Sequence, residues 1–394
     1  MYQVAFIYLK TEPEISVKKK GGTYNMANTP FKFDHVGSFL RPESLKKARR
    51  DYEAGNITAE ELKSVEDKAI TELIKKEKEV GLHAITDGEF RRATWHLDFM
   101  WAFGGVGHSK TETGLPFHGE DAMIDDTYLT GKVVYKTHPF IEHFKFVQQF
   151  EDENTVAKYT IPAPAQTFQQ MIVPQNYENT KKYYATNEEL IQDIGLAYQA
   201  VIKQFYEAGC RNLQFDDCTW GAIVGDAAKQ RYKSLGIDLE DVKAQLLAVN
   251  NLALENKPAD MVITSHICRG NYHSTFFTSG PYDSVADYVF AQEHVDALLL
   301  EYDDERSGGF EPLSKVSPDK KVVLGLITTK TPKLEDKQTV IDRIHEAAKY
   351  IPLERLCLSP QCGFASCEVG NKLTEEEQWA KLALVKEIAE EVWG

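Results

Sequence analysis

From Phe31 onward, short apolar runs alternate along the chain with longer segments that are apolar on one face only. Short, near-continuous apolar runs predict strands of a parallel sheet that is covered on both faces. Eight runs of this kind occur along the chain. The predicted strands are FDHVGSF (33–39), HAITDGE (83–89), KYTIPAP (158–164), NLQFDD (212–217), MVITSHIC (261–268), ALLLEY (297–302), VVLGLIT (322–328) and LCLSPQC (356–362).

The longer segments between these runs predict amphipathic helices. They cover residues 42–55, 58–81, 187–209, 239–256, 283–295 and 336–351. Thr58 and Glu61 have the spacing of a capping box, and Gly81 and Gly209 stand where helices end. Eight strands that alternate with helices predict an α/β fold of the (β/α)8 TIM-barrel type.

Residues 95–157 depart from this alternation. Glycine, aromatic and polar residues are mixed there, and GKVVYKTH (131–138) has the pattern of a small hairpin. We therefore expect an inserted loop and hairpin excursion over one mouth of the barrel. Because no repeat, low-complexity segment or linker divides the chain, we expect a single TIM-barrel catalytic domain over residues 26–394.

The first residues do not take part in the predicted fold. SVKKKGGTYNM (16–26) joins a Lys/Gly patch to a second methionine, Met26. Lys-Gly-Gly is one translation of a purine-rich ribosome-binding sequence, which indicates that residues 1–25 are a non-native extension and that the native chain begins at Met26. The alternative is a disordered N-terminal tail that begins at Met1.

Composition and charge argue against several classes of function. Of the 394 residues, 42% are hydrophobic and 27% are charged, which suits a globular protein with a large core. A net charge of −15 without a long basic run argues against nucleic-acid and anionic-membrane partners. No apolar run reaches the roughly 20 residues of a membrane helix, and MYQVAFIYL lacks the features of a signal peptide. Six cysteines in a chain of this length indicate reduced thiols and a cytoplasmic location.

The stretch VITSHICRGN (262–271) carries the first chemical signal. His266 and Cys268 are two residues apart at the end of an apolar run. Residues at this spacing in a strand point to the same face, and at the end of a barrel strand they point into the mouth where barrel active sites lie. The pair alone fits a metal chelate and a core strand about equally well.

Two further strand ends favour the metal site. Glu301 follows four apolar residues in ALLLEY, and Cys362 follows the strand LCLSPQ. A glutamate is rarely buried unless it is paired or binds a metal. Together with His266 and Cys268 these side chains make a ligand set that suits Zn²⁺. The alternatives are a surface carboxylate at Glu301, since EYDDE is acidic throughout, and a small core residue at Cys362.

Polar residues follow the remaining strands. Ser38 and the amides around Gly37 offer an anion-binding turn, and acidic side chains occur at two other strand ends, as Asp87 with Glu89 and as Asp216 with Asp217. Carboxylates bind an ammonium group, and N–H groups with a hydroxyl bind a carboxylate, so the set suits a zwitterion. The alternative is that these acids are solvated or paired with Arg91 and Arg92.

These motifs carry a resemblance to a known family. DHVGSFLRP, TDGEFRR, LQFDDCTWG, SHICRGN, LLLEYDDERSG and LSPQCGF occur in that order over residues 31–394. In order and strand placement they resemble the catalytic C-terminal barrel of cobalamin-independent methionine synthase, most closely its short, single-barrel bacterial members. The resemblance implies a zinc-dependent methyltransferase that methylates the thiol of homocysteine to form methionine.

The resemblance also implies roles for individual residues. Zinc is held by His266, Cys268, Glu301 and Cys362, and it binds the homocysteine sulfur. The substrate carboxylate is held by Ser38, and the substrate amino group by Glu89 and Asp216. Coordination to Zn²⁺ deprotonates a thiol that is otherwise mostly protonated at neutral pH, because a free thiol has a pKa of ~8.5.

The chain also departs from the family pattern. It has no room for the second, N-terminal barrel of the full-length enzymes, and no counterpart of their folate-stacking stretch is evident. The family has a histidine thought to protonate the leaving folate nitrogen, whereas this chain has Thr328, Thr329 and Lys330 in that region. Lys330 is a candidate acid if burial lowers its pKa, and a solvated lysine otherwise.

These departures leave the methyl donor open. Methyltetrahydrofolate, a methyl-corrinoid protein and a small methylated compound all remain candidates. Three alternative functions are a zinc-dependent thiol alkyltransferase with another acceptor or donor, a non-catalytic zinc- or amino-acid-binding barrel, and a barrel of the uroporphyrinogen decarboxylase type.

Overall fold

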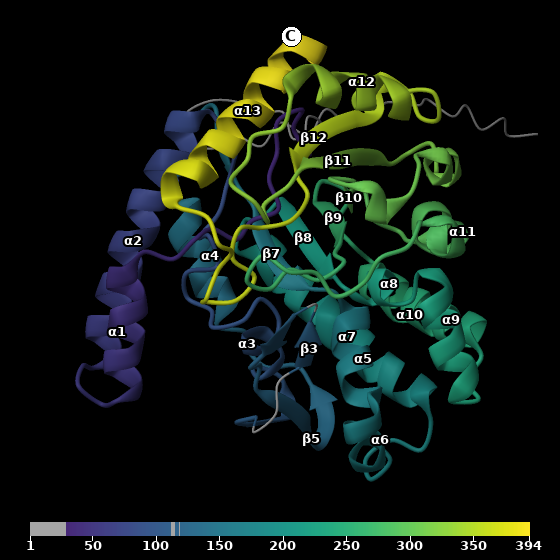
Figure 1. Ribbon diagram of the computed structural model, residues 1–394. Helices are drawn as coiled ribbons and strands as arrows, with labels where there is room; N and C mark the ends of the chain where they lie inside the picture. Colours follow the sequence, from purple (N-terminus) through teal and green to yellow (C-terminus); the bar gives the residue numbers. More distant parts are fainter. Residues whose placement is uncertain (1–28, 112–114, 118) are drawn as a thin grey trace, which may run out of the picture.

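The computed structural model describes residues 29–111, 115–117 and 119–394 (Figure 1). Residues 1–25 and Met26, where the sequence suggests an extension and a second start, lie outside this part of the chain. Within it, the helices are too short or too polar to cross a membrane.

The centre of the molecule is the predicted barrel of parallel strands. Six strands pair in the order β12-β11-β10-β9-β8-β7, and β1 pairs with β6. The strands are β1 (Ala84–Ile85), β6 (Val156–Ala157), β7 (Tyr159–Pro162), β8 (Asn212–Asp217), β9 (Val262–Ile267), β10 (Ala297–Glu301), β11 (Lys321–Ile327) and β12 (Leu356–Pro360). Each named strand falls on a predicted run except β6, which directly precedes the predicted run at 158–164.

The first predicted strand, 33–39, forms only a bridge between Phe33 and Leu358 of β12. Two backbone hydrogen bonds with Leu358, from Asp34 N at 3.0 Å and to Lys32 O at 2.9 Å, close the barrel at this point. The strand stops early because the Asp34 carboxylate accepts from the backbone amide of His35 at 2.8 Å, which competes with a strand ladder.

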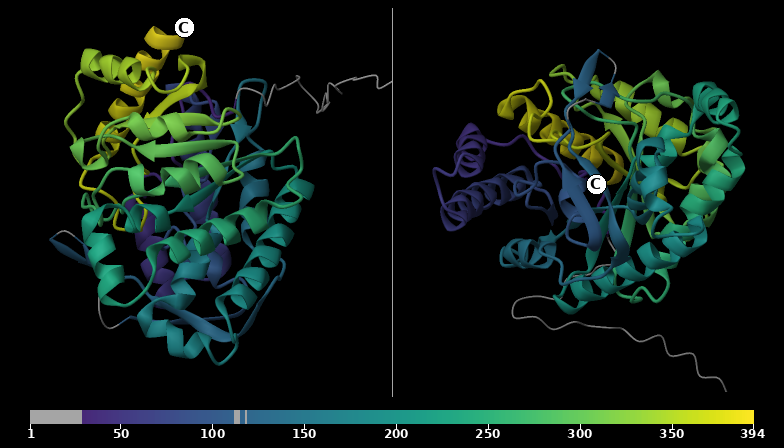
Figure 2. Two further views of the ribbon diagram at one scale, coloured as in Figure 1. Left: turned by 90° about the vertical axis from the view of Figure 1, so that its right-hand side faces the viewer. Right: turned by 90° about the horizontal axis from the view of Figure 1, so that it is seen from below.

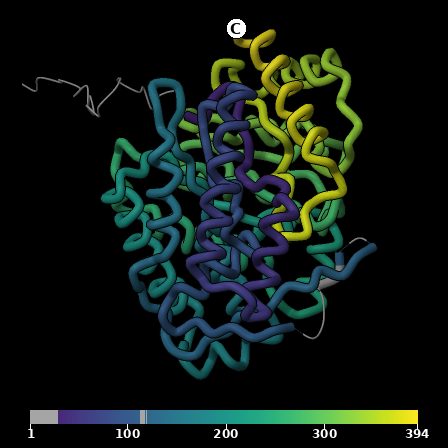
Figure 3. Tube along the Cα trace, turned by 90° about the vertical axis from the view of Figure 1, so that its left-hand side faces the viewer, coloured from purple at the N-terminus to yellow at the C-terminus, as the bar shows by residue number. Residues whose placement is uncertain are grey.

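Helices surround this sheet, as Figure 2 shows from two sides. The main ones are α1 (Glu43–Glu53), α2 (Ala59–Val80), α5 (Pro164–Ile172), α6 (Pro174–Thr180), α7 (Asn187–Glu207), α8 (Thr219–Ala222), α9 (Gly225–Ser234), α10 (Leu239–Leu254), α11 (Asp283–Gln292), α12 (Lys337–Ala347) and α13 (Glu375–Trp393). The predicted capping box at Thr58 and the stop at Gly81 are confirmed for α2. The predicted helices did not include α13, which lies beside α2 (Figure 3).

The excursion over residues 95–157 is present and differs in detail from the prediction. It contains α3 (Leu97–Met100), β2 (Gly104–Ser109), β3 (Leu115–Phe117), β4 (Glu120–Ala122), β5 (Asp126–Val134) and α4 (Phe140–Gln148). β2 pairs with β5 and β3 with β4, both antiparallel. GKVVYKTH therefore supplies only the end of β5, because its pairing partner lies earlier in the chain.

Candidate active site

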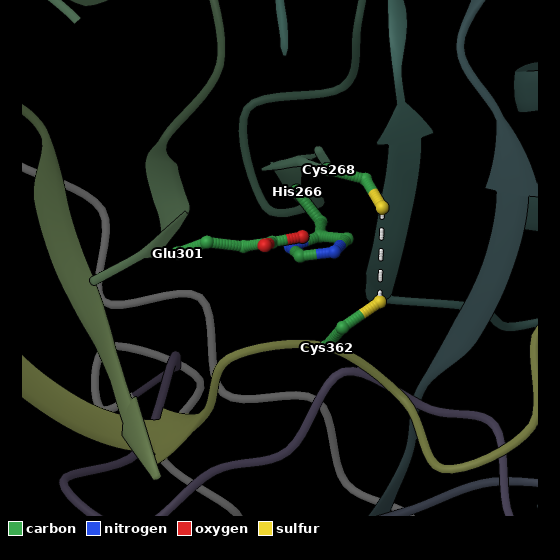
Figure 4. A group of neighbouring side chains, drawn as sticks. All are labelled: His266, Cys268, Glu301 and Cys362. Atoms are coloured by element: carbon green, nitrogen blue, oxygen red, sulfur yellow. Dashed lines mark hydrogen bonds between the residues drawn. The ribbon is translucent and has the colours of Figure 1, made fainter. Parts of the chain in front are cut away.

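Four side chains meet at the carboxyl ends of three barrel strands (Figure 4). His266 and Cys268 come from the end of β9, Glu301 is the last residue of β10, and Cys362 follows β12. Their ligand atoms lie within 4.8 Å of one another, and all four residues are buried. The structure thus brings together the four residues that the sequence indicated.

Main-chain groups orient two of these side chains. His266 Nδ1 donates to the carbonyl of Leu299 at 3.3 Å, which directs Nε2 toward the cluster. The amide of Arg269 donates to Glu301 Oε1 at 2.9 Å. His266 Nε2 and Glu301 Oε2 are buried and have no hydrogen-bond partner among the described residues. Leaving such atoms unpaired costs roughly 1–3 kcal/mol each, so the geometry calls for a ligand between them.

The two thiols complete the cluster. Cys268 Sγ and Cys362 Sγ are 3.8 Å apart, and the amide of Gly270 approaches Cys268 Sγ at 3.3 Å. The hydrogen bond that the Cys362 thiol donates to Cys268, together with burial, raises the pKa of the Cys362 thiol well above its ordinary value. Two thiolates and a carboxylate in this setting require a cation to be stable. The donor set of two sulfurs, an imidazole nitrogen and a carboxylate oxygen fits Zn²⁺.

A cavity of about 360 Å³ opens from this cluster. His266, Cys268 and Cys362 line one part of it, and the substrate-binding candidates Ser38, Glu89 and Asp216 line another part. The rest of the lining includes aromatic and amide side chains, among them Trp95, His96, Phe117, Gln166, Tyr272 and Phe277. The volume suits a small organic substrate.

Glu89 has a geometry that is unusual for a glutamate. Its φ of 62° lies in the left-handed region, where non-glycine residues are strained. Thr160 Oγ1 donates to Glu89 Oε1 at 3.0 Å, and Arg92 lies 3.4 Å from the same oxygen. Glu89 Oε2 has no partner within the described part of the chain. The pairing with Arg92 that the sequence left as an alternative is thus present, and it leaves one oxygen for the cavity.

Asp216 is the second acid of the cavity wall. Gln214 Nε2 donates to Asp216 Oδ1 at 2.8 Å. Burial raises the pKa of Asp216 to about 7. Burial also raises the pKa of Glu89 to about 7, opposed by Arg92 and reinforced by Asp216. Two buried acids beside one cavity favour a cation such as an ammonium group.

Ser38 lies near the end of the first predicted strand, 33–39, and hydrogen-bonds with the loop after β12. The amide of Phe364 donates to the Ser38 carbonyl at 2.9 Å, and the amide of Ala365 approaches Ser38 Oγ at 3.4 Å. A Cβ on Gly363 would lie 1.8 Å from Ser38 Oγ. Only glycine at 363 therefore allows Ser38 to approach the residue that follows Cys362.

Comparison with known proteins places this site in a family. The model of the cobalamin-independent synthase catalytic domain matches residues 31–391. The chain belongs to the cobalamin-independent methionine synthase family. This confirms the resemblance that the sequence motifs carried, and it agrees with the barrel fold.

Relatives in this family differ in how closely they match. YxjH from Bacillus subtilis, named as an uncharacterized protein, is 43% identical over 94% of this chain and 97% of its own length. A methionine synthase from Saccharolobus solfataricus is 25% identical over 83% of this chain and 86% of its own. A crystal structure of a putative vitamin-B12 independent methionine synthase from Listeria monocytogenes has 37% identity and a TM-score of 0.73, and the match covers 95% of this chain and all of that one.

Several other residues that the sequence analysis named, at strand ends or as possible partners of the acids, lie outside the cavity lining. Asp87 accepts from Tyr159 at 3.1 Å, and Asp217 accepts from Asn250 at 3.0 Å. Arg91 pairs with Glu66. Lys330 is 9% exposed, and its Nζ has no hydrogen-bond partner within the described part of the chain. Because Lys330 is not among the described residues that line the cavity, its role as an acid stays a prediction.

The sequence interpretation missed two chemically competent residues of the cavity wall. Cys218 and His96 both line the cavity. Cys218 lies two residues after Asp216, so the same-face spacing that singled out His266 and Cys268 predicts its direction too. His96 lies in the excursion, where no periodic pattern indicates which side chains face the barrel.

Proposed function

We propose that this protein is a zinc-dependent methyltransferase that transfers a methyl group to the thiol of homocysteine and so forms methionine. The observation that carries the proposal is the buried convergence of His266, Cys268, Glu301 and Cys362, with two of their polar atoms left without partners among the described residues. Membership in the family supports the reaction, and the adjoining cavity supports an amino-acid substrate.

The chain's own residues have separate roles in this proposal. Ser38 Oγ binds the substrate carboxylate. Glu89 and Asp216, deprotonated, bind its ammonium group, and the two contacts together direct the substrate sulfur toward the cysteine pair. Holding the thiol in one orientation replaces a bimolecular encounter with an effectively unimolecular step.

The metal ligands provide the chemistry of the thiol. His266, Cys268, Glu301 and Cys362 would hold the zinc ion, which when bound lowers the pKa of a thiol so that the thiolate is present at neutral pH. Because the four ligands are buried, water is excluded from the substrate sulfur and does not protonate it. The methyl donor is proposed to be methyltetrahydrofolate, a methyl-corrinoid protein or a small methylated compound.

A methionine-formation assay tests the proposal. The full chain is supplied with zinc and homocysteine and with each class of methyl donor in turn, and its zinc content is measured beside the activity. We expect stoichiometric zinc and methionine formation with one donor class. We expect Cys268→Ser and Cys362→Ser to lose both, whereas Cys357→Ser, a buried cysteine outside the cluster, keeps both. Full activity in the two ligand variants would rule the mechanism out.

A further inference from the structure

A third thiol lies beside the proposed zinc ligands. Cys218 lines the same cavity as Cys268 and Cys362. Cys218 is partly exposed, whereas Cys268 and Cys362 are only 6% and 4% exposed. The proposed methyl transfer gives Cys218 no role.

The strand register brings Cys218 close to Cys268. β8 and β9 are parallel, with Asp216 paired to His266 and Asp217 to Ile267. The amide of Cys268 donates to the Asp217 carbonyl at 2.9 Å, which completes this last pairing and holds Cys268 against the residue that precedes Cys218. Neighbouring strands are roughly 4.7–4.9 Å apart, and disulfides join Cα atoms roughly 4.4–6.8 Å apart. The residues directly before the pair, Asp217 and Ile267, are thus one strand spacing apart, and this brings the backbones of Cys218 and Cys268 close enough for us to infer a disulfide.

The backbone around the pair is held in this arrangement. Cys218 directly precedes α8, and Gly221 of that helix packs on the end of β9. A Cβ on Gly221 would lie 2.0 Å from the Cys268 carbonyl oxygen. The absence of a side chain at 221 therefore lets the turn that carries Cys218 lie directly against Cys268.

We propose that Cys218 and Cys268 form a reversible disulfide when the protein meets a peroxide, and that this disulfide removes a ligand from the metal site. Cys218 Sγ attacks the peroxide O–O bond, which gives a sulfenic acid and one water from hydrogen peroxide. Cys268 Sγ then attacks Cys218 Sγ, so that the S–S bond forms and the S–O bond breaks. The hydroxide leaves as a second water after taking a proton from the solvent, because a zinc-bound Cys268 is already a thiolate. The two thiols lose two electrons, and a dithiol reductant restores them.

The exposure of the three thiols sets the order of these steps. Cys218 meets an oxidant in the cavity first, because the other two are more deeply buried. Cys362 competes with Cys218 as the disulfide partner of Cys268, because the sulfur atoms of Cys362 and Cys268 are 3.8 Å apart. The disulfide needs only the two thiols, whereas the loss of zinc rests on the proposed zinc site. Failure of the disulfide to form would therefore leave the methyl-transfer proposal standing.

Mapping of the disulfide tests the inference. The zinc-loaded full chain is treated with hydrogen peroxide, alkylated, digested and analysed by mass spectrometry, while a chromogenic chelator reports zinc release. We expect a peptide pair joined through Cys218 and Cys268, together with zinc release, and we expect dithiothreitol to restore both thiols. Each variant is compared with its own untreated sample.

Three variants separate the possible outcomes. Cys218→Ser should lose the cross-link and most of the peroxide-induced zinc release. Cys367→Ser is the matched control, because Cys367 is also a partly exposed cysteine of the cavity wall, and it should behave as wild type. Cys268→Ser should leave Cys218 as a sulfenic acid that a 1,3-diketone probe captures. A cross-link between Cys268 and Cys362 alone, or equal zinc release with and without Cys218, would overturn the inference.

Discussion

The backbone amide of Arg269 donates to Glu301 Oε1 at 2.9 Å, so the loop after β9 fixes the carboxylate that ends β10. Because this bond occupies one carboxylate oxygen, only Oε2 remains for a cation, and it has no partner among the described residues. The carboxylate is thus prepared as a ligand with one free oxygen before any ion arrives.

Replacing this carboxylate tests its role as a ligand. In Glu301→Gln the side-chain oxygen still accepts from Arg269, and the remaining position becomes an amide nitrogen that does not bind a metal. We expect zinc affinity to fall by more than the roughly 10–100-fold that the loss of an outer-shell partner costs. Competition with a chromogenic zinc chelator measures it. Asp304→Asn, in the same acidic stretch but with an exposed side chain, should bind zinc as wild type does, and equal affinity in the two variants would contradict the assignment.

Substrate binding should depend on pH through Glu89. Its pKa is raised to about 7 by burial, so the carboxylate that binds an ammonium group is present above that pH and lost below it. We expect KM for homocysteine to fall between about pH 6 and about pH 8. Glu89→Gln should raise KM at the higher pH by roughly 10–100-fold, since a hydrogen bond to a charged group contributes roughly 1.5–3 kcal/mol. It should also make the profile less steep, so that only the dependence on Asp216, whose pKa is also about 7, remains. The exposed Glu255→Gln, outside the cavity lining, should keep the wild-type slope.

A methyl group at residue 363 should disturb Ser38. In Gly363→Ala the added Cβ would lie 1.8 Å from Ser38 Oγ, so one of the two must move. Overpacking of this kind costs roughly 1–3 kcal/mol of unfolding free energy, and displacement of the hydroxyl should raise KM for homocysteine. Urea unfolding and steady-state kinetics measure the two effects. The double variant with Ser38→Ala should regain part of the stability and keep the high KM, whereas a wild-type KM in Gly363→Ala would contradict the role of Ser38.

The pH dependence of stability should respond to Glu293. This residue is fully buried, and Trp220 Nε1 donates to its Oε2 at 3.1 Å. Burial, reinforced by Asp217, raises the pKa of Glu293 from its ordinary value of 4.5 to about 8. Between these two values the folded protein keeps a proton that the unfolded chain has released, so stability falls as pH rises through this window.

Glu293→Gln mimics the protonated form and should remove this loss. The variant's unfolding free energy relative to wild type should be higher at about pH 8.5 than at about pH 5, by on the order of a few kcal/mol. Urea unfolding at the two pH values measures the gain. The exposed Glu255→Gln serves as control, and a difference between Glu293→Gln and wild type that does not change with pH would contradict the prediction.

The sequence predicted the parts of the fold that local pattern determines. The run NLQFDD matches β8 residue for residue, because apolar Leu213 and Phe215 alternate with polar residues, which indicates a strand. It did not predict α13, whose apolar residues are distributed around the helix rather than on one face. It also placed both strands of the hairpin within GKVVYKTH, because long-range pairing of β5 with β2 leaves no local signal.

The candidate site was predictable to a similar extent. Position at a strand end was enough to bring His266, Cys268, Glu301 and Cys362 to one mouth of the barrel. Position at a strand end did not distinguish Asp216, which lines the cavity, from Asp217, which accepts a hydrogen bond from Asn250 outside the cavity lining. That distinction depends on tertiary packing, as does the contribution of the excursion to the cavity.

The hydrogen bonds from His266 to Leu299 O and from Arg269 N to Glu301 have an evolutionary consequence. Both use main-chain groups, which every residue type other than proline can supply. A change of side chain at residue 269 or 299 therefore does not by itself remove either hydrogen bond. The orientation of these two donors depends on the path of the barrel backbone, so extensive sequence divergence around them is compatible with an unchanged metal-binding geometry.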